Sequence, residues 1–198
     1  MYQLMNRREA VRKVTFLLGG AITATSLGVF TKGCIPIGGE KEVRFNDSHE
    51  ATLSEIADLI IPDTGVPGAK AAGVGPFIIM MMKDCYLQEV QKVFIDGLEK
   101  VEKESASRFN RSFITLSRTE REGVLEELKK EAEIQQETNI SEDIKDAPPH
   151  FFQLAVELTY LGYFTSEIGA TQALNYVHIP GRYEGCVPLK AGQKAWAV

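Results

Sequence analysis

Apolar residues recur in steps of three and four along most of the chain, which is the period of an amphipathic helix. The positions that follow this period fall into three groups: Leu53, Ile56 and Ile60; Leu87, Val90, Phe94, Leu98 and Val101; and Val124, Leu125 and Leu128. No segment alternates apolar and polar residues over more than four or five positions, as a half-buried strand would. The chain is therefore predicted to be all-α.

Local signals predict where the first and the third of these helices begin. Asp47 with Glu50, and Ser117 with Glu120, have the spacing of a capping box, in which two side chains satisfy free backbone N–H groups at a helix start. Pro62 is expected to end the first helix, because proline cannot donate the hydrogen bond that continues it.

The other segments differ in polarity. Pro76 suits the first turn of a short apolar helix that reaches Cys85, and this cysteine is expected to be a buried small hydrophobe. Residues 131–147 are polar and acidic and are predicted to form a loop or linker. Residues 151–164 are apolar around the whole helix circumference, which predicts a helix central to the core or to a partner's surface. Beyond residue 176 the chain has no period and is predicted to be an irregular tail, rich in Gly and Pro.

Composition and charge limit the class of protein. The 198 residues are 44% hydrophobic and 25% charged, which are values of a globular protein. We expect residues 35–198 to form a single helical domain. The formal charge of −5 argues against a protein that coats nucleic-acid phosphates.

The first 34 residues have the layout of an export signal. They carry a net charge of +4, and the uncharged run 14–30 follows the basic head. The pair Arg7-Arg8 is similar to a twin-arginine signal, which exports folded proteins; export of the unfolded chain remains the alternative. Gly33-Cys34 is similar to a lipoprotein box, so Cys34 is either lipidated or a plain thiol near the junction. The predicted location is the periplasm, with a membrane anchor if Cys34 carries lipid.

Residue types that support catalysis or cofactor binding are not arranged in recognisable motifs. The three histidines and three cysteines are too far apart in sequence for a local metal, haem c or iron–sulfur motif: His49, His150, His178, Cys34, Cys85 and Cys186. No glycine-rich phosphate motif follows a strand, and no GxSxG motif is present. We therefore predict no catalytic residue, no cofactor and no metal site in this chain.

Three segments are richer in Gly, Pro and aromatic residues than a small helical domain requires: IIPDTGVPGA (60–69), LTYLGYFTSEIG (158–169) and VHIPGRYEGCVP (177–188). With a helix ending in FxxGL at Phe94–Leu98 and the 113–116 stretch before a capped helix, they resemble the gluconate 2-dehydrogenase subunit 3 family over roughly residues 48–188. Members of that family are small, mostly helical subunits of periplasmic flavin-dependent sugar and polyol dehydrogenases.

The resemblance implies a non-catalytic subunit that stabilises a large FAD-dependent dehydrogenase subunit and escorts it during export. FAD would then lie in the large subunit, and haem c in a cytochrome c subunit that often completes the complex. The alternative is a stand-alone exported lipoprotein that binds a small sugar or scaffolds envelope proteins.

Aromatic and tail residues are the candidates for a partner interface, since large rings with hydroxyl groups are enriched in interfaces. The candidates are Tyr160, Tyr163, Phe164, Arg182, Tyr183 and Cys186. For the aromatic residues of segment 158–169, ordinary core packing is the alternative. For Cys186 we predict a disulfide to the large subunit, with a bond to Cys85 and a free thiol as the other outcomes.

Overall fold

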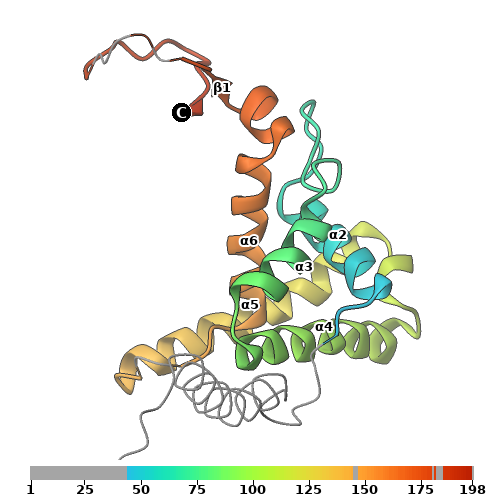
Figure 1. Ribbon diagram of the computed structural model, residues 1–198. Helices are drawn as coiled ribbons and strands as arrows, with labels where there is room; N and C mark the ends of the chain where they lie inside the picture. The colour runs from blue at the N-terminus through green and yellow to red at the C-terminus, as the bar shows by residue number, and fades with distance from the viewer. Residues whose placement is uncertain (1–43, 145–146, 180, 182–184, 198) are drawn as a thin grey trace, which may run out of the picture. The chain divides into compact units, whose positions relative to one another are not determined.

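The computed structural model describes residues 44–144, 147–179, 181 and 185–197. The main helices are α2 (Asp47–Ile60), α3 (Val74–Cys85), α4 (Gln88–Phe109), α5 (Arg118–Ser141) and α6 (Phe151–Thr165) (Figure 1). A 3₁₀ turn, η1 (Phe113–Thr115), precedes α5, and a π-helical turn, η2 (Gly169–Ala173), follows α6. The short strands β1 (Asn175–Tyr176) and β2 (Trp196–Ala197) pair in parallel. The prediction of an all-α fold is confirmed. The predicted signal, with Arg7, Arg8 and Cys34, lies outside the described residues.

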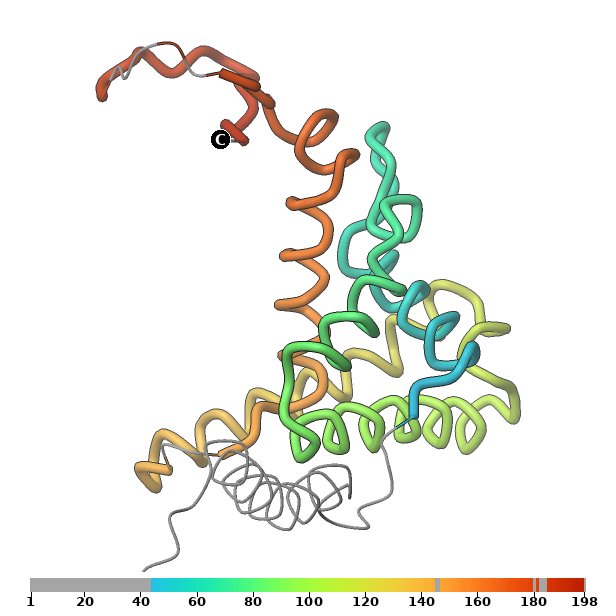
Figure 2. The backbone as a smooth tube through the Cα atoms, in the orientation of Figure 1, coloured from blue at the N-terminus to red at the C-terminus, as the bar shows by residue number. Residues whose placement is uncertain are grey.

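Helix α6 lies at the centre of the helical packing. It contacts α2, α3, α4 and α5, and the tube in Figure 2 can be followed along it from the α5 side to the turn η2. The apolar stripes predicted from the sequence supply the core: Leu53, Ile56, Phe94, Leu98, Val101, Val124, Leu125 and Leu128 are all buried, with Leu154 and Leu158 of α6. Leu87 departs from the predicted stripe, because it precedes α4 as its N-cap and is 75% exposed.

Two glycines allow neighbouring helices to approach each other closely. A Cβ on Gly97 of α4 would lie 2.3 Å from the Cβ and Cγ atoms of Phe151, and one on Gly162 of α6 would lie 2.5 Å from the Phe77 ring. The neighbours of Gly97 in the FxxGL stretch, Phe94 and Leu98, are buried, and the Phe94 and Phe151 rings are 5.0 Å apart. The motif is thus the α4 surface on which the start of α6 packs.

The two predicted capping boxes had different outcomes. Ser117 and Glu120 form the predicted box at the start of α5, with the Ser117 N–H donating to Glu120 Oε2 at 2.7 Å. At α2 the cap is one residue earlier than predicted, because the Asn46 side chain accepts the His49 N–H at 2.9 Å and Asp47 is already helical.

Three sequence predictions are wrong. Residues 131–141 continue α5 as helix, since Glu, Gln and Ala are strong helix formers and the Lys100 ammonium binds Glu131 at 2.6 Å. Cys85 is exposed, because it lies on the solvent side of the last turn of α3. Helix α4 does not end at the FxxGL stretch but continues to Phe109, where Asn110 adopts the left-handed conformation (φ 53°) that ends many helices.

Candidate functional site

The loop between α2 and α3 is held against α6 by one buried tyrosine. The Tyr163 hydroxyl donates a hydrogen bond to the Pro67 carbonyl at 2.9 Å, and the residue is only 3% exposed. This contact joins two of the segments that carry the family resemblance, 60–69 and 158–169. Burial, and then the negative charge of Asp63, raises the pKa of Tyr163. The phenol therefore stays protonated and remains a donor.

The loop itself is a tight, closed structure. The Ala69 N–H donates to the Ile61 carbonyl at 2.9 Å, and the Gly65 N–H donates to Asp63 Oδ1 at 3.2 Å. Gly68 is required where the two ends meet, because a Cβ there would lie 2.6 Å from the Ile61 carbonyl oxygen. Asp63, Thr64 and Gly65 are exposed at the tip, so the loop presents a fixed backbone to solvent.

Tyr163 was a predicted interface residue, and its position corrects that prediction. Its ring is buried between α6 and the loop, and its hydroxyl is used inside the domain. For Tyr163, the alternative of ordinary core packing is the correct one. Tyr163 lies on the same side of α6 as Thr159 and Gly162, which are also buried.

We expect Tyr163→Phe to lower the free energy of unfolding by about 1–2 kcal/mol, because the Pro67 carbonyl loses its donor while the ring packing stays. Tyr160→Phe is the matched control: Tyr160 is 47% exposed, so its hydroxyl can bond to water, and the change should be within about 0.5 kcal/mol. Urea unfolding of the two purified variants measures both values. Equal stability of the two would show that the hydroxyl does not hold the loop.

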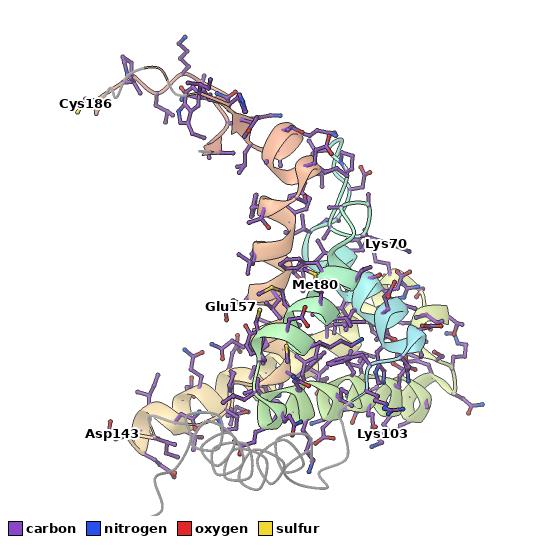
Figure 3. All side chains as sticks on the ribbon, in the orientation of Figure 1. Lys70, Met80, Lys103, Asp143, Glu157 and Cys186 are labelled. Carbon is purple, nitrogen blue, oxygen red and sulfur yellow. The ribbon has the colours of Figure 1, made fainter. Side chains whose placement is uncertain are left out.

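The side of α6 that faces away from the core exposes a set of large apolar side chains. We call this set the α6 face and define it as Tyr160, Leu161 and Phe164. They are 47%, 44% and 39% exposed. The Tyr160 and Phe164 rings lie parallel, with centroids 6.2 Å apart. Glu157 lies one turn earlier, at the open side of α6 in Figure 3. Leu161 was missed by the sequence analysis, although its place next to Tyr160 on a helix that buries Leu154 and Leu158 could have indicated it.

A second set of exposed apolar side chains follows in the C-terminal segment. We call it the tail surface and define it as Tyr176, Ile179, Val187, Leu189 and Trp196, whose exposed fractions range from 51% to 85%. Within the described part of the chain, Cys186, labelled in Figure 3 at the far end of this segment, is an exposed free thiol, as is Cys85. Arg182 and Tyr183, the other predicted interface residues of the tail, lie outside the described residues.

A shallow groove lies between the surfaces of α5 and α6, next to the α6 face. Its volume is about 350 Å³, and its lining combines apolar residues with charged ones: Ala132, Phe152, Val156, Lys129, Glu133 and Glu157. Two of the charged groups, the Lys129 ammonium and the Glu133 carboxylate, pair with each other at 4.0 Å along α5, and the groove is open to solvent. This arrangement suits contact with another surface better than it suits acid–base chemistry.

His150 has a structural role at the start of α6. Nδ1 of His150 accepts the Phe152 N–H at 3.1 Å and so caps α6, and its Nε2 lies 3.8 Å from Glu131. Burial lowers the pKa of both His49 and His150, more strongly than nearby carboxylates raise it. Within residues 44–197, as far as they are described, no three His, Cys, Asp or Glu side chains gather as metal ligands. No helix in the described ranges is long and apolar enough to span a bilayer.

The described residues thus form a small helical fold with an exposed aromatic face on α6. The family model for gluconate 2-dehydrogenase subunit 3 matches residues 47–181. The chain belongs to this family, and is thus related to a subunit of a gluconate dehydrogenase. The match includes the loop and the α6 face but ends inside the third segment of the resemblance, at residue 181. No similar curated protein and no similar solved structure was found.

Proposed function

We propose that this chain is the non-catalytic small subunit of a FAD-dependent sugar or polyol dehydrogenase of the gluconate type. In this proposal it binds the large flavin-binding subunit through the α6 face, stabilises that subunit, and escorts it through export by the Arg7-Arg8 signal. Hydride transfer from the sugar to FAD, and electron transfer onward to a cytochrome c, take place on the partners.

The α6 face is the observation that carries the proposal. Its three large side chains stand on the same helix whose other side is the centre of the core, so the surface they form is fixed by the whole domain. Aromatic side chains held in this way lose little conformational entropy when a partner covers them, and Tyr is enriched among residues that dominate binding energy. Family membership supplies the class of partner, a dehydrogenase subunit.

The internal hydrogen bonds and ion pairs give Glu102 and Glu55 a structural role. Glu102 accepts hydrogen bonds from Thr52 Oγ1 at 3.0 Å and from the Phe113 N–H at 3.2 Å, so it joins α2, α4 and η1. Glu55 binds both Lys70 and Arg121, so it joins α2 to α5. These carboxylates are used to hold helices together, which agrees with a subunit whose chemistry lies elsewhere.

The experiment is co-expression of this chain with a large FAD-dependent dehydrogenase subunit of the gluconate type from the same genome. With the wild-type chain we expect the large subunit to be recovered from the periplasm, bound to this chain and containing flavin, whereas the isolated chain shows no flavin absorbance. Tyr160→Ser/Phe164→Ser should reduce the recovered complex at least tenfold, since two anchoring rings are lost. Arg7→Lys/Arg8→Lys should leave both chains in the cytoplasm.

The matched control is Ile134→Ser/Ile140→Ser, which also removes two exposed apolar side chains (63% and 74% exposed) but from α5. It should leave the complex unchanged. Recovery of the large subunit in equal amount and with equal flavin content without this chain would contradict the proposal. It would favour a stand-alone exported lipoprotein instead.

A further inference from the structure

The tail surface has little to pack against within the described part of the chain. Its segment is closed by the pairing of β1 with β2, where the Asn175 N–H donates to the Ala195 carbonyl at 2.8 Å, and by a contact of the Lys194 ammonium with the Gln172 carbonyl. A two-residue pair of strands is marginal in water. Leu189 is 85% exposed and Ile179 is 76% exposed, so the apolar side chains of this segment gain little from their own fold.

The tail surface is also hollowed. Trp196 lines a concavity of about 560 Å³ together with Asn175, Val187, Pro188 and Lys190. Large exposed apolar side chains around a concavity are typical of a surface that receives side chains of a partner.

Charge separates this segment from the rest of the domain. Residues 44–167 contain 13 Lys and Arg against 23 Asp and Glu, a formal charge of −10, whereas residues 168–198 contain three basic residues and one acidic residue, a formal charge of +2. The tail surface therefore fits a patch that is apolar at its centre and acidic around it. Residues 44–167 of a second copy are acidic as well, so a second copy of this chain is the rival occupant, and sedimentation of the purified chain distinguishes the two.

We infer that the tail surface is a second docking site for the large flavin-binding subunit, separate from the α6 face, and that it receives an apolar patch with an acidic rim. The inference rests on the proposed function for the identity of the partner. The position in the chain supports it, because β1 follows directly on η2, which itself contacts α6. Most of the tail surface also lies beyond residue 181, where the family match ends. The α6 face then provides the contact common to the family, and the tail surface selects this chain's own large subunit.

The test measures the affinity of the purified full-length chain for the large flavoprotein subunit. Leu189→Ser/Trp196→Ser should raise the Kd at least tenfold, and Lys190→Glu should raise it about three- to tenfold at 50 mM salt and less at 500 mM, because screening weakens an exposed charge contact. Ile134→Ser/Ile140→Ser, which also removes two exposed apolar side chains but from α5, should stay within twofold of wild type. Amide exchange at residues 185–197 should slow in the complex.

The outcomes separate the two proposals. If the wild-type chain does not bind the large subunit, the proposed function fails and this inference fails with it. If the wild type binds and Leu189→Ser/Trp196→Ser binds within twofold, only the inference is overturned. If the wild-type chain forms a dimer in sedimentation that this double variant abolishes, the tail surface is covered by a second copy, which also overturns it.

Discussion

Gly97→Ala should lower the free energy of unfolding by about 2–3 kcal/mol, although alanine favours helix over glycine by about 1 kcal/mol at an exposed site. The added methyl group would lie 2.3 Å from the Cβ and Cγ atoms of Phe151, which are the root of that side chain and cannot swing away. Either α6 moves from α4 or the Phe151 ring leaves its 5.0 Å contact with Phe94. Both changes open the junction of α4 with α6, where Phe94 and Phe151 are buried.

Gly123→Ala is the control for this prediction, because Gly123 is also helical but a Cβ added there would have no neighbouring atom within 4 Å. This variant should gain about 0.5–1 kcal/mol from helix propensity. Urea unfolding of both variants, followed by circular dichroism, gives the two free energies. A gain in stability for Gly97→Ala would show that the helices have room to separate there and that the FxxGL stretch has no close-packing role.

Arg121→Met should cost about 2–3 kcal/mol. The Arg121 side chain is 16% exposed and binds Glu55, whose side chain is 18% exposed. Its other N–H groups donate to the carbonyls of Phe113 at 3.1 Å and Ile114 at 2.7 Å, and its guanidinium lies 5.9 Å from the centre of the Phe113 ring. Methionine fills a similar volume but satisfies none of these acceptors, so part of the cost is the desolvation of groups left without a donor.

Arg118→Met is the matched control on the same helix. Arg118 pairs with Glu122 one turn later, and both side chains are 53% exposed, so this change should stay within about 0.5 kcal/mol. Equal effects of the two variants, measured by urea unfolding at pH 7, would show that Arg121 acts as an ordinary surface charge.

The pairing of Arg121 with Glu55 also predicts a pH dependence. Burial alone would raise the pKa of Glu55, but Lys70 and Arg121 together outweigh it and hold the pKa below the ordinary value of 4.5. The unfolded chain therefore takes up this proton first on acidification. The stability that Glu55 contributes is fully present above pH 4.5 and is lost as the pH falls through the lower pKa of the folded state. Urea unfolding over this pH range should show that Arg121→Met reduces the loss.

The sequence by itself determined the helices and their buried sides. The spacing of Leu53 and Ile56, or of Phe94, Leu98 and Val101, is a local property that tells which side of a helix must leave water, and the Ser117 box acts within four residues. The resemblance to the family was also present in the sequence, because short segments in a fixed order carry it.

Only the tertiary structure decided which aromatic residues of α6 remain exposed. Tyr160, Tyr163 and Phe164 are all large aromatic residues of the same helix. Tyr163 is buried and donates to the carbonyl of Pro67, which lies 96 residues away in the chain, whereas Tyr160 and Phe164 remain at the surface. Residues 131–141 were missed for a different reason: their Glu, Gln and Ala content favours helix locally, and a polar composition by itself does not distinguish a solvated helix from a loop. The burial of Tyr163, in contrast, depends on a contact between distant residues, which a local pattern does not contain.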